Sequence, residues 1–136
     1  MAKIASFCLA FVVIISLIET SSGAVNIIDI YRNVVFDYAV MKNPKPVVVF
    51  YYSSSSCGAC KWSIKPMLER MAKRKNDKIY LALVDFDKVP DLQSSHGIHE
   101  IPTTRVLYKG EVMDEVAGLS WSQLVPLVNH ASKIAV

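Results

Sequence analysis

The sequence predicts an α/β fold in which helices flank both faces of a central mixed β-sheet. Two continuous apolar runs predict buried strands, VVVFYY at residues 47–52 and IYLALVDFD at residues 79–87. Between them, residues 57–75 have the spacing of a long amphipathic helix. The elements follow one another as strand, helix, strand, helix, hairpin and helix. This order predicts a layered α/β domain with residues 47–52 as its central strand.

Length and composition limit the number of domains and the kind of partner. The chain has 136 residues, which allows one compact domain. Hydrophobic residues make up 52% and charged residues 20%, which excludes a disordered chain. The net charge of +3 is far from the dense basic surfaces that bind phosphate backbones, so we expect no nucleic acid partner.

The first 23 residues have the pattern of a secretory signal peptide. Lys3 precedes an uncharged stretch of 15 residues, shorter than the roughly 20 that cross a bilayer core. Small residues follow, so we expect cleavage after Gly23 or Ala24; an uncleaved membrane anchor is the alternative. The sequence thus predicts a signal peptide over residues 1–23 and a folded domain over residues 24–136. We expect the mature protein to be secreted or in the lumen of the secretory pathway, without membrane association.

The first element of the domain has two interpretations. Apolar residues at helical spacing between positions 27 and 38 predict a helix that ends near Met41, although residues 25–30 equally suit a short strand. Prolines at positions 44 and 46 stop this segment before the first buried strand.

The long helix has an apolar face and a basic face. The apolar face is predicted to carry Trp62, Ile64, Met67, Leu68 and Met71. The basic residues are predicted to form its solvated side, since positive charge is favoured towards a helix carboxyl end. They are Lys61, Lys65, Arg70, Lys73, Arg74, Lys75 and Lys78.

Three further elements complete the domain. A short helix is expected over residues 90–95, closed by Gly97. Residues 103–108 and 112–117 flank Lys109-Gly110-Glu111 as an antiparallel hairpin. Ser120 and Gln123 have the spacing of a capping box that opens the last helix, in which Pro126 should produce a kink.

Cys57 and Cys60 form a Cys-x-x-Cys motif at the first turn of the long helix. There the first sulfur lies beside unpaired backbone N–H groups and the positive end of the helix dipole, which favours the thiolate over the thiol. Cys57 is therefore the candidate nucleophile. Cys60, one turn further on and more enclosed, is the candidate resolving thiol, because it can attack a mixed disulfide and release the substrate. Gly58 and Ala59 permit the tight turn between them.

A zinc site is the alternative role for two closely spaced cysteines. Zinc takes four ligands, and the mature chain offers only His96, His99 and His130 besides the thiols. None of these histidines has a partner at metal-ligand spacing, so we expect no metal and read each first as a surface or loop residue. The redox chemistry of the pair itself needs no cofactor.

Taken together, these residues resemble the thioredoxin superfamily over nearly all of the mature chain. The resemblance rests on the VVVFYY strand, the Cys-Gly-Ala-Cys motif, the helix that contains Pro66, residues 83–87, Ile101-Pro102-Thr103 and Gly118. It implies a thioredoxin fold in which Pro102 is a cis proline facing the cysteine pair and Ile101 contacts an extended substrate. It also implies a substrate groove near the pair, where we place Ser56, Gly58 and Ala59, with Ser55 and the His99-Glu100 corner at its rim.

The sequence also departs from that family. Ser56 stands where the family usually has Trp, and it could cap the helix instead. The family's buried acid corresponds to Tyr51 and the accompanying lysine to Leu83, so both members of the charge pair are absent. Pro66 falls one residue later than the family's helix proline, which predicts an extra residue held as a bulge in the helix.

These observations predict a thiol–disulfide oxidoreductase that acts on protein disulfides. Its partners would be proteins with disulfides or thiols and a reductase or oxidase that resets the cysteine pair. The alternative is a thioredoxin-fold binding module or chaperone with little or no redox turnover.

Overall fold

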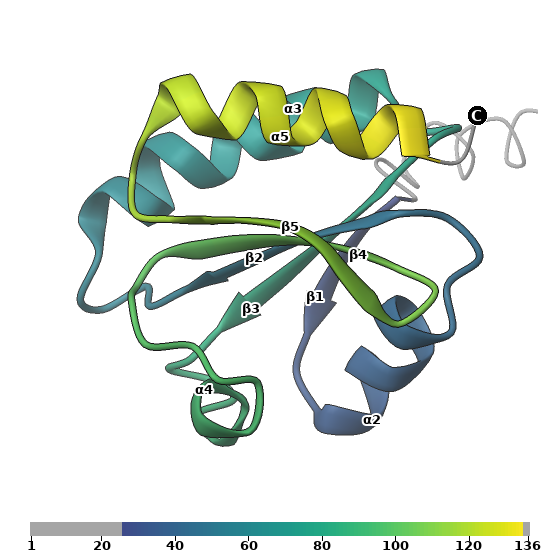
Figure 1. Ribbon diagram of the computed structural model, residues 1–136. Coiled ribbons are helices and arrows are strands. Elements are labelled where there is room, and N and C mark those ends of the chain that lie inside the picture. Colours follow the sequence, from purple (N-terminus) through teal and green to yellow (C-terminus); the bar gives the residue numbers. More distant parts are fainter. Residues whose placement is uncertain (1–25, 135–136) are drawn as a thin grey trace, which may run out of the picture.

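The computed structural model describes residues 26–134, which form a five-stranded mixed sheet with helices on both faces (Figure 1). The strands lie in the order β1-β3-β2-β4-β5 and are β1 (Ile27–Ile30), β2 (Val47–Tyr52), β3 (Tyr80–Asp85), β4 (Thr103–Tyr108) and β5 (Glu111–Ala117). The α-helices are α2 (Asn33–Phe36), α3 (Lys65–Arg74), α4 (Asp91–Ser95) and α5 (Trp121–Ile134), and two π-helical segments are η1 (Asp37–Met41) and η2 (Cys60–Ile64). The predicted α/β architecture is confirmed.

The segment with two interpretations contains a strand and then a helix. Residues 27–30 pair with β3 in parallel, Ile27 beside Leu81, and the helical part begins only at Asn33. A single helix from residue 27 is therefore wrong. The β-branched residues in this stretch favour a strand once an edge of β3 is available to them.

β2 is the central strand, and all six of its residues are buried. It pairs in parallel with β3 and antiparallel with β4. Because side chains alternate along a strand, Val48, Phe50 and Tyr52 point to one face and the residues between them to the other. The prediction of a central strand buried on both faces is confirmed.

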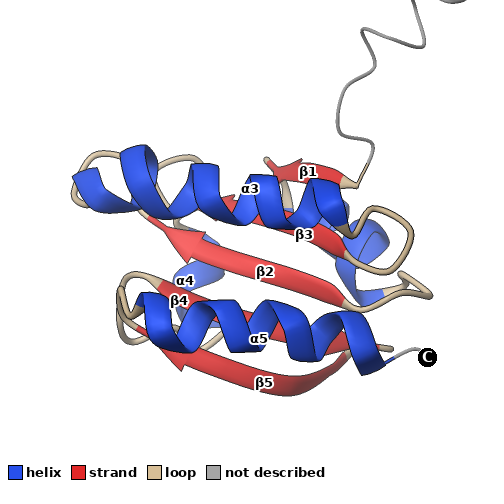
Figure 2. Ribbon diagram, turned by 90° about the horizontal axis from the view of Figure 1, so that it is seen from above, coloured by secondary structure: helices blue, strands red, loops and turns tan. Residues whose placement is uncertain are grey.

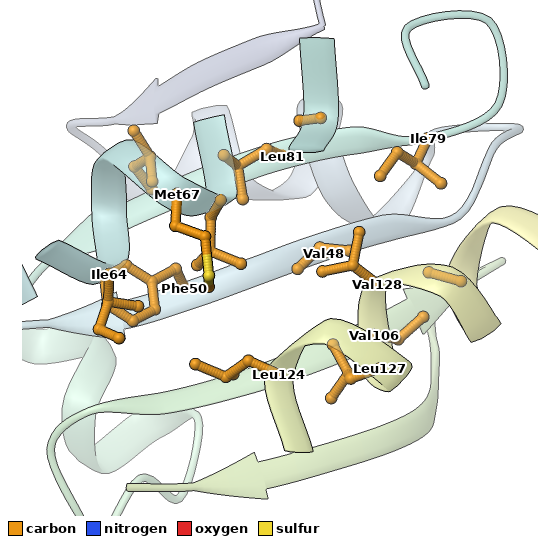
Figure 3. Close-up of a cluster of buried hydrophobic side chains, with 14 of the residues drawn as sticks. Val48, Phe50, Ile64, Met67, Ile79, Leu81, Val106, Leu124, Leu127 and Val128 are labelled. Atoms are coloured by element: carbon orange, nitrogen blue, oxygen red, sulfur yellow. The ribbon is translucent and has the colours of Figure 1, made fainter. Parts of the chain in front are cut away.

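Two hydrophobic clusters lie on the two faces of the sheet. The larger one fills the space beneath α3 and α5, which lie side by side over the sheet (Figures 2 and 3). The second packs against α2 and α4 on the opposite face. Cys60 belongs to the first cluster, which places the cysteine pair at the edge of the α3/α5 face.

The hairpin and the last helix match their predicted positions, with one local difference. Lys109 and Gly110 both have positive φ, 53° and 80°, as a two-residue hairpin turn requires. The Ser120 hydroxyl lies 3.0 Å from the Ser122 hydroxyl, and the Gln123 N–H donates to the Ser120 carbonyl, so the capping box is not formed. α5 runs as one helix through Pro126.

The predicted signal peptide at residues 1–23 lies outside the described residues. Among residues 26–134, no helix has the length and apolar character needed to cross a membrane.

Candidate active site

Three segments that are distant in sequence meet at one edge of the sheet. β2 and β3 are parallel, so their carboxyl ends lie together, and Cys57 follows the first while Asp87 follows the second. β4 runs antiparallel to β2, with Thr103 beside Tyr51, so Pro102 comes at this edge as well. The sheet topology therefore brings the cysteine pair and the Ile101-Pro102 loop together.

Cys57 and Cys60 form a disulfide with an S–S distance of 2.02 Å. Cys57 is half-buried, whereas Cys60 is fully buried. The Cys60 backbone N–H donates a hydrogen bond to the Cys57 sulfur over 3.1 Å. One sulfur of the pair is thus reachable from solvent and receives an N–H bond from the first turn of the helix, while the other sulfur is enclosed.

Ser56 does not cap this helix, contrary to the prediction. Its own backbone N–H donates to the Ser53 hydroxyl at 3.3 Å, and its side chain is exposed. The Cys57 sulfur takes the capping position instead, because the N–H three residues further on, that of Cys60, donates to it. The chain enters the helix one residue later than a Ser56 cap requires.

Asp87 organises the serine loop before Cys57, a role the sequence analysis missed. Its carboxylate accepts hydrogen bonds from the Ser53 hydroxyl at 2.8 Å, the Ser54 hydroxyl at 2.9 Å and the Ser55 N–H at 2.7 Å. These bonds lower the pKa of Asp87 from 3.8 to about 2, and the bond from the Ser55 N–H has the largest effect. Four serines in a row, followed 30 residues later by an acid in a strand-ending Asp-Phe-Asp, were the available signal.

Asp85 is a second acid at this edge, and it is buried. Its carboxylate accepts hydrogen bonds from the Ser54 N–H at 3.2 Å and the Asp87 N–H at 3.0 Å. It lies beside Tyr52 in the sheet. Burial, and secondly the charge of Asp85, raise the pKa of Tyr52 to about 12, so its phenol stays protonated at neutral pH.

Ile101 and Pro102 form the loop that enters β4, and the peptide bond between them is cis. The Pro102 carbonyl accepts a hydrogen bond from the Gly118 N–H at 2.8 Å, and the Thr103 hydroxyl donates to the Glu100 carbonyl at 2.6 Å. Pro102 is buried and Ile101 is half-buried. Within the described residues the Ile101 backbone makes no hydrogen bond, so its N–H and carbonyl are free at this edge.

Tyr51, which the resemblance places at the position of the family's buried acid, lies on the face of α2 and α4, away from Cys60. Phe50 lies in the same buried cluster as Cys60, and it pairs in the sheet with Leu83, the position of the family's lysine. A difference of one residue moves a strand side chain to the other face of the sheet.

Tyr51 instead contacts His96 on the opposite face, where its hydroxyl lies 3.0 Å from His96 Nδ1. Burial raises the pKa of Tyr51 to about 12. A cavity of about 250 Å³ opens there, bordered by both residues and by Arg105. His96, which lies in the turn after α4, is thus part of a half-buried network. This cavity lies on the face away from the cysteines.

The helix after Cys60 contains the predicted extra residue. η2 (Cys60–Ile64) is a π-helical turn that passes into α3 at Lys65. The wider turn places Cys60 and Ile64 on the buried face. Trp62 lies between them and is 76% exposed, so its predicted place on the apolar face is wrong.

No group of three or more metal-ligating side chains comes together within residues 26–134. His130 lies on the surface, with its Nδ1 3.3 Å from the Asp114 carboxylate, and His99 is exposed.

Comparison with known proteins identifies the family. The thioredoxin family model matches residues 28–130. Thioredoxin Y1, chloroplastic, of Arabidopsis thaliana is 29% identical over 73% of this chain and 57% of its own. Mitochondrial thioredoxin of Mus musculus is 32% identical over 62% of this chain and 49% of its own, and thioredoxin of Rickettsia bellii is 30% identical over 70% and 90%. The chain thus spans about half the length of the first two relatives.

The solved thioredoxin of Malassezia sympodialis has a similar structure, with a TM-score of 0.69 and 27% identity over 78% of this chain and 90% of that chain.

The relatives correct the predicted location. Their names place them in chloroplasts and mitochondria, and others are bacterial, which contradicts a secreted or secretory-lumen protein. The prediction rested on the apolar composition of residues 1–23, and such a stretch does not by itself decide the compartment. The fold, the cis proline loop, the cysteine pair and the match over residues 28–130 agree with one another, and the chain belongs to the thioredoxin family.

Proposed function

We propose that this protein is a thiol–disulfide oxidoreductase that acts on protein disulfides, with Cys57 as nucleophile and Cys60 as resolving thiol. One observation carries the proposal. The disulfide joins a half-buried cysteine to a fully buried one at the start of a helix. Only the exposed sulfur can meet a large substrate, and the buried one can reach only its partner.

The reaction runs in two exchange steps from the reduced pair. The Cys57 thiolate attacks one sulfur of a substrate disulfide, so a mixed disulfide forms and one substrate thiolate leaves. The Cys60 thiolate then attacks the Cys57 sulfur, which forms the Cys57–Cys60 bond and releases the second substrate thiolate. Two electrons pass from the pair to the substrate, and the reverse sequence oxidises a dithiol.

The surroundings of the pair support this order of events. The helix N-terminus favours a negative charge on Cys57, and the Cys60 N–H is already directed at that sulfur over 3.1 Å. Ser56, Gly58 and Ala59 are exposed around it, so a substrate can approach closely. We propose that an extended substrate segment pairs with the free backbone groups of Ile101, beside Pro102.

A turnover assay tests the proposal. The protein should accelerate the reduction of insulin disulfides by dithiothreitol, and Cys57→Ser should abolish that acceleration. In a second assay, Cys60→Ala should accumulate mixed disulfides with substrate proteins, because the resolving thiol is missing. Equal insulin aggregation with wild type and Cys57→Ser would reject the catalytic role.

A binding or chaperone module is the second candidate, and one feature favours it. The side chains that face Cys60 include Phe50 and Leu83, which are apolar and cannot assist deprotonation of the second thiol. If this slows resolution enough, the protein holds partners without turning them over. In that case partners would co-purify equally with wild type and with a Cys57→Ser/Cys60→Ser variant, through non-covalent contacts.

The redox equilibrium of the Cys57–Cys60 pair sets the direction of electron flow. It also determines whether a reductase or an oxidase resets the pair. Measuring the equilibrium constant of the Cys57–Cys60 couple against glutathione decides between them. A couple near the glutathione poise supports oxidation or isomerisation, and a much more reducing couple supports a reductase supplied by an electron donor.

A further inference from the structure

The basic residues of the chain are concentrated on the helix that begins at the cysteine pair and on the turn that follows it. Residues 61–78 contain seven Lys and Arg and two acidic residues, whereas the rest of the chain has eight basic and ten acidic residues. None of the seven forms an ion pair with another residue of the described part. The helix therefore presents unbalanced positive charge along its solvent side, where α3 covers the sheet (Figure 2).

Trp62 marks the end of this basic surface that is nearest to Cys60. It is 76% exposed, more than any other large apolar side chain of the described residues. The Lys61 ammonium lies over its ring, 5.0 Å from the centroid, and Lys65 follows one turn later. A single exposed apolar residue is ordinary, but an exposed Trp beside unpaired cations and a reactive cysteine pair is suited to a peptide contact.

The π-helical turn η2 explains how this surface arises. With the extra residue, Cys60 and Ile64 remain in the core while Trp62 projects outward. The chain thus has a small Ser56 just before Cys57, and its large exposed aromatic side chain, Trp62, follows Cys60 by two residues on the helix.

We propose that Trp62, Lys61 and Lys65 form a docking surface for an acidic segment of the disulfide-containing polypeptides on which the enzyme acts. The proposal rests on the proposed function. Trp62 would pack against the apolar part of the segment, and the two lysines would pair with carboxylates near the reacting cysteine. The cations further along the helix, from Arg70 to Lys78, would steer acidic polypeptides to this edge.

Three synthetic peptides of equal length test the proposal. Each carries one disulfide, flanked by Glu, by Gln or by Lys. Wild type should reduce the Glu peptide with a kcat/KM about threefold to tenfold above that of the Lys peptide, the range expected for two surface ion pairs. The preference should shrink as salt is added. If the protein reduces all three peptides at equal rates, the docking surface is overturned and the proposed oxidoreductase function still holds.

Charge reversal locates the effect. Lys61→Glu/Lys65→Glu should invert the order of the peptides. Lys61 is exposed, Lys65 is half-buried and neither forms an ion pair within the described residues, so we expect the variant to fold. The matched control is Lys42→Glu/Lys45→Glu, which changes the charge equally at the opposite end of β2 and should keep the order. Each variant is judged by the ratio of its kcat/KM values for the Glu and Lys peptides. A change in the reactivity of Cys57 affects all peptides equally and therefore cancels in this ratio. An order unchanged by reversal at Lys61 and Lys65 would contradict the proposal.

Trp62→Ala tests the aromatic contact. It should lower kcat/KM severalfold for all three peptides and keep their order, and Trp62→Phe should restore most of the rate. Rates unchanged by Trp62→Ala would remove Trp62 from the surface.

Two further outcomes separate this proposal from others. If the protein reduces none of the peptides, their binding is measured instead, with Ser in place of each Cys of the peptide. Tighter binding of the Glu peptide supports the docking surface, and equal binding of the three peptides overturns it. If the protein binds phosphatidylserine vesicles through Lys61 and Lys65 but treats the three peptides alike, the surface is a lipid contact and the proposal is wrong.

Discussion

The Ser53 hydroxyl donates a hydrogen bond to the Asp87 carboxylate over 2.8 Å, which joins the loop after β2 to the loop after β3. The Ser53 carbonyl in turn accepts the Cys57 N–H at 3.0 Å. The position of the candidate nucleophile Cys57 is thus linked through one serine to an acid in the loop after the neighbouring strand. The serine run at residues 53–56 is therefore an ordered loop that supports the candidate active site.

This relationship predicts an acid-sensitive contribution to stability. The pKa of Asp87 is lowered to about 2 in the folded protein, so its contribution is present above the unfolded value of 3.8 and is lost as the pH falls through about 2. Asp87→Asn removes the carboxylate. The free energy of unfolding, measured with urea between pH 4 and 2, should therefore fall more steeply in wild type than in Asp87→Asn. Parallel curves for the two proteins would show that the carboxylate does not hold the loop.

The contact between Tyr51 and His96 predicts a cost for removing one hydroxyl. Tyr51 is 1% exposed, and Tyr51→Phe leaves His96 Nδ1 without its partner. We expect a loss of about 1 kcal/mol in the free energy of unfolding, with turnover unchanged because this contact lies on the face away from Cys60. Denaturant unfolding and the insulin assay measure the two quantities. A large loss of turnover would mean that this face communicates with the cysteines.

His96 predicts a second pH effect, near neutrality. Burial, and secondly the positive charge of Arg105, lower its pKa, so the folded protein favours neutral imidazole. The corresponding stability is present above the unfolded pKa of about 6.5 and is lost as the pH falls below it. His96→Asn should flatten this part of the pH profile. A slope in His96→Asn equal to that of wild type would show that this histidine does not link stability to pH.

The π-helical turn predicts that one residue of the helix is dispensable for folding. Deleting Ser63 should convert η2 into an ordinary α-helical turn, which is the more stable geometry. Trp62 should then rotate towards the apolar face, and its fluorescence should shift to shorter wavelength in a Trp121→Phe background. Ser63→Ala, which keeps the residue count, should leave the emission unchanged. A deletion variant that unfolds would show that the core requires the wider turn.

Two glycines should respond in opposite ways to alanine. Gly58 begins the helix, and an added Cβ would have no atom within 4 Å, so Gly58→Ala should raise the free energy of unfolding by about 0.4–1 kcal/mol. Gly110 has a φ of +80°, with Met41 3.4 Å from the added Cβ, so Gly110→Ala should lower it by about 1–2 kcal/mol. Thermal unfolding of both variants checks this, and destabilisation by Gly58→Ala would mean that the cysteine loop needs glycine.

Much of the fold followed from patterns that are local in the chain. The buried strands at residues 47–52 and 79–87, the hairpin turn and the short helix before Gly97 lie where their residue types place them. The late position of Pro66 correctly indicated an extra helical residue, and the cis bond before Pro102 agrees with the family resemblance.

Other features depended on contacts between distant parts of the chain. Asp87 is more than 30 residues from the serines that it holds, and Tyr51 is 45 residues from His96. The resemblance assigns Tyr51 and Leu83 to the family's buried charge pair, but the pairing of β2 with β3 places Phe50 beside Leu83. A register that differs by one residue exchanges the two faces of a strand, and no local pattern contains that register.

The sequence by itself determined most of the elements of this protein and the cysteine pair at its candidate site, because propensity, periodicity and the spacing of two cysteines are properties of neighbouring residues. Only the tertiary structure decided which side chains surround those cysteines. Strand pairing and the packing of helices on the sheet bring residues 53, 87 and 102 to one edge, and they turn Trp62 outward beside Lys61. The surroundings of the site are set by contacts between segments that are far apart in the chain.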